Sequence, residues 1–175
     1  RSPVAAAIAR DNAALSRIDR RIDDLDRARD AVETTLHLGP LPALAGFGVR
    51  TTVMQESEIP AAVRLLRERL AVARAAAVTF VYDGTTDPRV ITISAVADAP
   101  GVGTDTVPVI VAATDTGATV LLHERPVDLG DVWATLDAAL LPRGRRATGP
   151  YRHVVRPDGA IELATPTVSN EGPRG

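Results

Sequence analysis

Apolar side chains recur along residues 4–38 at alternating intervals of three and four residues, with Arg29 as the one polar member of the series. Because an α-helix repeats about every 3.6 residues, this spacing places them in a narrow stripe on one side of a helix. A stripe of this kind stabilises a helix only when it packs against a partner, and we expect a second copy of the chain. The pattern predicts a dimerisation coiled-coil helix over residues 1–38, with an interface formed by Leu15, Ile18, Ile22, Leu25, Val32 and Leu36.

An alternative for this segment is an ordinary amphipathic helix that lies along its own domain. No Gly or Pro interrupts the pattern between Val4 and Leu38, and uninterrupted patterns beyond about 25 residues are typical of coiled coils. Arg and Asp are interleaved on the other faces, which indicates a solvated surface and not a stripe that binds phosphate groups. Both features favour the coiled coil.

The pattern changes after residue 38, where Gly39 is followed by Pro40 and Pro42. Gly suits the end of a helix and Pro cannot continue one, so residues 39–47 are predicted to be a linker. A compact domain is then expected over residues 48–169, followed by a disordered tail over residues 170–175. Strands are predicted over residues 49–55, 78–82, 90–96, 107–112, 118–123, 151–156 and 161–168, and helices over residues 59–75 and 129–141.

The predicted elements of the domain follow one order twice: strand, helix, strand, strand. Turn-forming residues separate the paired strands, as in Pro157-Asp158-Gly159, where Gly supplies the positive φ of a hairpin. The sequence therefore predicts an α+β fold, in which a long N-terminal helix precedes a duplicated domain with an antiparallel sheet. Ligand sites commonly form at the junction of two such halves.

Composition excludes several classes of protein. The net charge is −2 and the basic residues do not form a concentrated patch, so this chain alone is not expected to bind DNA. The short basic run at Arg143, Arg145 and Arg146 is interpreted as a solvated loop. The absence of Cys excludes disulfide scaffolds and thiolate metal sites, and we expect neither a metal nor a cofactor. Without a signal peptide or a long apolar run, the expected location is the cytoplasm, with no membrane contact.

Several short motifs occur in a distinctive order: Gly48-Val49-Arg50, Val81-Tyr82-Asp83, Leu122-His123-Glu124 ahead of Asp128-Leu129, and Gly149-Pro150. With the long helix before them, they resemble the C-terminal part of MerR-family transcriptional regulators, which joins a dimerisation helix to a GyrI-like effector-binding domain. Members of that family carry a winged helix-turn-helix domain ahead of the helix. The resemblance therefore implies a homodimer that binds DNA only through an N-terminal domain absent from this sequence. A ligand would then change how the helices space the DNA-binding domains.

The resemblance also implies a ligand site between the two halves of the domain, where aromatic side chains and often a glutamate meet a small apolar or aromatic molecule. The ligand-binding residues implied are Tyr82, Trp133, Tyr151, His153, His123 and Glu124. His153 stands where the glutamate is expected. Because a desolvated cation needs a carboxylate, we expect neutral or weakly acidic ligands. Acidic ligands are expected to bind better below about pH 6.5, where a free imidazole is protonated.

Some of these residues have simpler interpretations. Trp133 is equally well explained as core packing on an amphipathic helix, and His123 as an exposed or structural residue. If His153 does not line the site, Glu124 or Glu162 becomes the candidate for its charged group.

We expect the protein not to be an enzyme. The sequence has no Gly-x-Ser-x-Gly elbow, no His-Glu-x-x-His helix and no glycine-rich phosphate loop. Two alternatives remain open: a GyrI-like small-molecule hydrolase that uses His153 with Tyr151, Glu124 or Glu162 for acid-base chemistry, and a structural dimer that binds no ligand.

Overall fold

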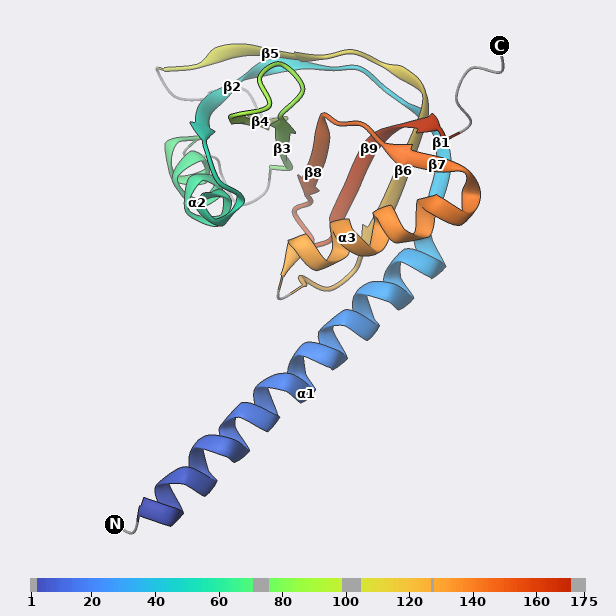
Figure 1. The fold of residues 1–175 in the computed structure, drawn as a ribbon. Helices are drawn as coiled ribbons and strands as arrows, with labels where there is room; N and C mark the ends of the chain where they lie inside the picture. The colour runs from blue at the N-terminus through green and yellow to red at the C-terminus, as the bar shows by residue number, and fades with distance from the viewer. Residues whose placement is uncertain (1–2, 71–75, 99–104, 127, 171–175) are drawn as a thin grey trace.

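The structure is a computed structural model that describes residues 3–70, 76–98, 105–126 and 128–170. A long helix, α1 (Pro3–Thr35), projects from an α+β domain built on an antiparallel sheet (Figure 1). The described strands are β1 (His37–Leu41), β2 (Leu44–Val53), β3 (Val78–Asp83), β4 (Ile91–Ala97), β5 (Val107–Val111), β6 (Thr114–Leu122), β7 (Arg145–Ala147), β8 (Tyr151–Val155) and β9 (Ile161–Ser169). The helices of the domain are α2 (Ile59–Leu70) and α3 (Leu129–Leu140), with short 3-10 turns η1 (Glu56–Glu58) and η2 (Leu141–Arg143). The predicted fold class is confirmed.

The strand order shows the duplication. The main path is β1-β6-β9-β8-β3-β4-β2-β5, and β7 pairs with β9 beside it. This order is symmetric about the contact between β8 and β3, so β1, β6, β9 and β8 of one half correspond to β5, β2, β4 and β3 of the other. Along the chain the repeats are β1-β2-α2-β3-β4 and β5-β6-α3-β8-β9, with β7 added in the second, so the first repeat has one strand more than the sequence predicts. The first strand of each repeat pairs with the second strand of the other.

The predicted linker is wrong, because residues 39–47 lie mostly in β1 and β2. Pro40 is tolerated in β1 because β1 is an edge strand, where a residue without an N–H is not excluded from the sheet, and Pro42 lies between β1 and β2. The register of β1 against β6 shifts between Gly39 and Leu41, on either side of Pro40. β1 and β2 are thus one long strand with a corner at residues 42–43, and β5 and β6 form its counterpart. Figure 1 shows the two bent strands running together along the top and turning down at the right.

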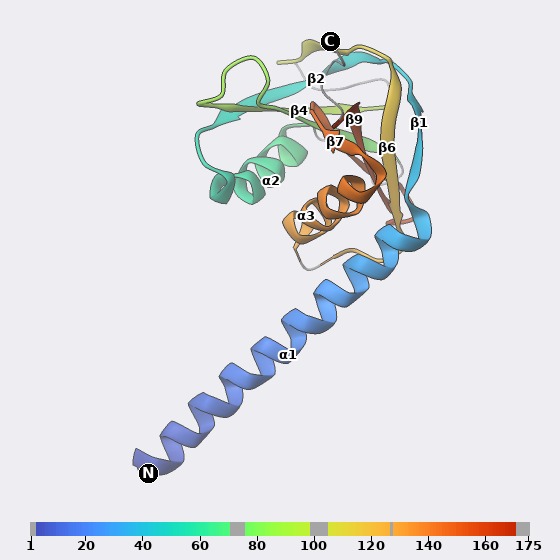
Figure 2. The same cartoon turned by 45° about the vertical axis from the view of Figure 1, so that its right-hand side comes forward.

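Helices α2 and α3 cover the same face of the sheet (Figure 2). Each helix buries an apolar stripe: Ala62, Leu66 and Leu70 from α2, and Val132, Leu136 and Leu140 from α3. The α2 stripe packs on β2, β3 and β4, and the α3 stripe packs on β6 and β9. The described residues therefore form two core clusters, one in each half, and the α2 cluster includes residues of the central strand β3.

The apolar stripe of α1 divides into two parts with different roles. Val32 is fully buried in the α3 core of its own domain, and Leu36 packs against the same core. Val32 therefore has no exposed surface to offer a partner, whereas Leu36 is partly exposed, and the dimer interface stays a prediction. The N-terminal part remains uncovered: Leu15, Ile18, Ile22 and Leu25 are between 41% and 58% exposed.

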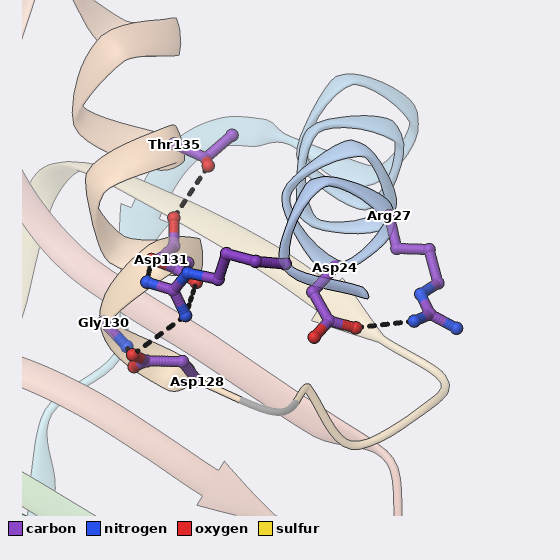
Figure 3. A network of polar contacts seen from close by, with 7 residues as sticks. Asp24, Arg27, Asp128, Gly130, Asp131 and Thr135 are labelled. Carbon is purple, nitrogen blue, oxygen red and sulfur yellow. Dashed lines mark hydrogen bonds and ion pairs between the residues drawn. The ribbon is translucent and has the colours of Figure 1, made fainter. Parts of the chain in front are cut away.

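Polar contacts fix the angle at which α1 leaves the domain. Arg21 donates to Asp131 at 2.7 Å and to Asp128 at 3.4 Å. Asp128 also caps α3 by accepting the N–H of Gly130 at 2.8 Å. Figure 3 shows Asp128, Gly130 and Asp131 at the start of α3, facing α1. The beginning of α3 and the middle of α1 are thus joined across more than 100 positions of sequence.

Other sequence predictions fall at the edges of the described residues. The helix predicted over residues 59–75 is described to Leu70, and residues 71–75 lie outside the described part. Of the predicted tail, only Asn170 is described, and its N–H donates to the carbonyl of Gly144 at 2.8 Å. The basic run interpreted as a loop contains β7 instead. Within the described residues, no helix is long and apolar enough to cross a membrane.

Candidate functional site

The candidate site lies on the helix-covered face, where the two halves of the domain meet at β3 and β8. Phe80 pairs with His153 across these strands, and Tyr82 pairs with Tyr151. Paired residues of an antiparallel sheet project to the same face, so all four rings point toward the helices. With Trp133 from α3, they form what we call the aromatic cluster: Phe80, Tyr82, Trp133, Tyr151 and His153. The prediction of a site between the halves rested on four of these five residues.

Tyr82 and His153 form the inner part of the cluster. The Tyr82 hydroxyl lies 3.1 Å from His153 Nδ1, and both side chains are more than nine-tenths buried. The Phe80 and His153 ring centroids are 5.5 Å apart. Burial raises the pKa of Tyr82 above its ordinary value. Burial, together with the charges of Arg67 and Arg125, lowers the pKa of His153 to about 4. His153 is therefore neutral at physiological pH, and the expected gain in acid binding below about pH 6.5 is not supported.

The proton positions of Tyr82 and His153 follow from the hydrogen-bond partners available to each group. His153 is the only described partner of the Tyr82 hydroxyl, so the hydroxyl proton is satisfied only when it is donated to His153 Nδ1. A neutral imidazole then carries its own proton on Nε2. His153 Nε2 is buried and has no hydrogen-bond partner among the described residues. The inner end of the cluster therefore presents an unsatisfied N–H donor.

Trp133 and Tyr151 form the outer part of the cluster. Their rings meet edge to face, with centroids 5.0 Å apart, and both side chains are half-buried. Asp137 lies one turn after Trp133 on α3, and its charge, after burial, is the second cause that raises the pKa of Tyr151. Burial also raises the pKa of Asp137 itself. An acidic group therefore lies on the outer side of the cluster.

Two arginines act on the inner part. Arg67 lies one turn after Val63 on α2, and Val63 packs against the core that contains Tyr82. Arg125 lies between β6 and α3. Both side chains are exposed and form no ion pair or hydrogen bond with another described residue, and their charges add to burial in lowering the pKa of His153. The sequence pattern does not distinguish these two arginines from the others, because their effect depends on which segments the fold brings to β8.

The remaining predicted residues lie elsewhere. His123 and Glu124 follow the end of β6 and are exposed, and neither forms a hydrogen bond or ring contact with the described residues of the aromatic cluster. Glu162 forms an ion pair with Arg156 at the start of β9. The structure thus brings Tyr82, Trp133, Tyr151 and His153 together and leaves His123 and Glu124 apart from them. No group of three or more His, Cys, Asp or Glu side chains within the described ranges is arranged to hold a metal ion.

The opposite face of the central strands carries a different feature. Arg152, between Tyr151 and His153, is buried and donates to the carbonyls of Pro42 at 2.6 Å and Ala112 at 3.2 Å. These carbonyls belong to the corners of the two bent strands, so one guanidinium fastens both corners to β8. Burial lowers the pKa of Arg152. Beside it lies a cavity of about 500 Å³, whose lining includes Arg50, Ser94 and the β5–β6 corner.

No protein-family model matches the sequence, and no curated protein matches it significantly. Solved structures do match the fold. An integron cassette protein from the mobile metagenome of Vibrio cholerae is similar with a TM-score of 0.59 and 11% identity, over 77% of this chain and 96% of that one. The C-terminal domain of EcmrR is similar with a TM-score of 0.51 and 13% identity, over 77% of this chain and 97% of that one. SAV2435 bound to tetraphenylphosphonium is similar with a TM-score of 0.50 and 8% identity, over 76% of this chain and 93% of that one. At these identities, the similarity shows a shared fold.

Proposed function

We propose that this chain is the effector-binding and dimerisation region of a MerR-like transcriptional regulator and has no catalytic activity. The observation that carries the proposal is the division of α1. Its C-terminal turns are part of the domain core through Ala28 and Val32, while its N-terminal turns leave the domain with an uncovered apolar stripe. One rigid element therefore joins the domain to a surface that needs a partner.

The domain supplies the sensing part of this proposal. The aromatic cluster lies at the junction of the halves, and α3, which carries Trp133, is joined to α1 through Arg21 and Asp131. A small molecule that displaces Trp133 would shift α3 and, through these contacts, the angle of α1. Coupling requires that the ligand bind one helix arrangement better than the other. Two neighbours in fold, EcmrR and SAV2435, support the proposal as proteins of the same architecture, the second of them with a bound organic cation.

DNA binding is not expected of these 175 residues themselves. The described surface of α1 interleaves basic and acidic residues, as in the pair Arg27 and Asp24, and offers no basic stripe. The proposed dimer would place two α1 helices side by side, so that segments preceding them are held at a distance set by the helix pair. Ligand-dependent changes in that distance are the proposed output.

The test is the mass of the protein in solution. Replacing Ile18 and Ile22 with Asp adds two charges to the uncovered stripe and should convert a dimer into the 18.4 kDa monomer, with the domain still folded. The matched control replaces Ala13 and Ser16, which are exposed and outside the stripe, so that the same charge is added elsewhere. Sedimentation equilibrium should show a dimer for the wild type and the control. A monomeric wild type, or a dimeric stripe variant, would contradict the proposal.

A further inference from the structure

The inner part of the aromatic cluster contains a hydrogen-bond donor that the protein itself does not satisfy. His153 is 8% exposed, its Nδ1 is occupied by Tyr82, and its Nε2 has no partner among the described residues. A buried donor left without an acceptor costs about 1–3 kcal/mol, so an acceptor atom from a bound molecule would be stabilised there. The missing acceptor defines one atom of the ligand.

The charges around this donor define the group to which that atom belongs. Arg67 on α2 and Arg125 in the segment before α3 are exposed, their charges act on His153, and neither forms an ion pair with a described acidic residue. Two positive charges that act on an N–H donor favour an anionic acceptor and disfavour a cation. A carboxylate satisfies both requirements, since its oxygens accept hydrogen bonds and carry the compensating charge.

The rings define the rest of the molecule. Trp133 and Tyr151 are the half-buried members of the cluster. A planar ring of a ligand can take the place of either ring in their edge-to-face contact, and the contact energy lost is small. His153 Nε2 has no contact with solvent, so a ligand reaches it only after the side chains around it shift. The pair at the outer side, with access to solvent, is the part of the cluster best placed to shift.

We infer that the aromatic cluster binds a planar apolar molecule with a carboxylate, whose oxygen accepts the proton of His153 Nε2 while Arg67 and Arg125 supply the opposing charge. This inference rests on the proposed function, because it names the ligand class of the same site. The ligand differs in charge from the tetraphenylphosphonium bound to SAV2435. The reason lies in this chain: the unpartnered donor of His153 is at the inner end of the cluster, the charges of two arginines act on it, and the charge of Asp137 acts on Tyr151 at the outer side.

The experiment compares three probes of one shape on the full 175-residue chain by isothermal titration calorimetry. They are naphthalene-2-carboxylate, its methyl ester and 2-naphthyltrimethylammonium. We expect the carboxylate to bind at least tenfold more tightly than the ester and the ammonium probe to bind most weakly. Arg67→Gln and Arg125→Gln should each weaken the carboxylate several-fold and leave the ester unchanged. Arg64→Gln, which removes an exposed charge from the same helix, is the matched control and should change neither.

Each other outcome overturns a defined part of the reasoning. Tighter binding of the ammonium probe, if it is lost in Asp137→Asn, would place a cation at the outer rings. That result would overturn the proposed ligand class, but the proposal that the domain senses a ligand would stand. Equal affinities for acid and ester, unchanged in both arginine variants, would remove the arginines from the site. No binding of any probe would contradict this inference and the sensing part of the proposed function together, although the dimerisation test is unaffected.

Discussion

Lowering the pH should destabilise this domain through one residue, His153. In the unfolded chain its pKa is the ordinary value of 6.5, whereas in the folded domain burial and two arginines lower it to about 4. The unfolded state therefore binds more protons as the pH falls through 6.5, and stability decreases until both states are protonated below about pH 4. Between about pH 7.5 and about pH 5, linkage assigns to His153 a loss of about 2 kcal/mol in the free energy of unfolding.

The assay is urea unfolding followed by the fluorescence of Trp133, the single tryptophan, at several pH values and one protein concentration. His153→Gln keeps an acceptor for Tyr82 and removes the titrating group, so its stability should fall by about 2 kcal/mol less than that of the wild type over this range. His123→Gln removes an exposed histidine and should behave as the wild type does. If wild type and His153→Gln lose the same stability, the folded pKa of His153 is not lowered, and the neutral, buried donor on which the ligand class rests is wrong.

Three further predictions test the fold around the site. Arg152→Met should lower the free energy of unfolding by roughly 2–4 kcal/mol, because the corner carbonyls of Pro42 and Ala112 lose a charged donor that is itself buried. Chemical denaturation measures this change, and an unchanged midpoint would show that Arg152 does not hold the corners to β8. Val32→Ala should cost roughly 2 kcal/mol and leave the sedimenting mass unchanged, whereas loss of the dimer without loss of stability would return Val32 to the interface. Gly48→Ala should cost roughly 1–3 kcal/mol in thermal unfolding, since a Cβ there would lie 2.1 Å from the carbonyl oxygen of Ala95, and a neutral effect would contradict that close approach.

The hydrophobic pattern was sufficient for the elements and for the duplication. The period of each segment identified the long helix, both domain helices and most strands, because apolar spacing records which face is buried. The hydrophobic pattern gave the wrong prediction at residues 39–47, where Pro and Gly were interpreted as signs of a linker. An edge strand tolerates both, and only the pairing of β1 with β6 distinguishes an edge strand from a linker.

The site was predictable in part. Tyr82, Tyr151 and His153 alternate along two strands, so their common face followed once those strands were recognised as neighbours. Arg67 and Arg125 were not predictable, because their effect on His153 depends on how α2 and the segment before α3 pack over β8. The apolar series of α1 was also predictable only in part. Its spacing is continuous to Leu36, and only the packed structure shows which of its residues contact the domain core.

The central claim is that occupation of the aromatic cluster changes the arrangement of two α1 helices. Because the chain has no cysteine, Ala13→Cys allows one exposed spin label per protomer on α1. Pulsed electron paramagnetic resonance should give one distance between the labels of a dimer, and saturating naphthalene-2-carboxylate should shift that distance in the wild-type background but not with His153→Gln. The absence of any label-to-label distance, or one distribution that is the same with and without naphthalene-2-carboxylate, would contradict the account.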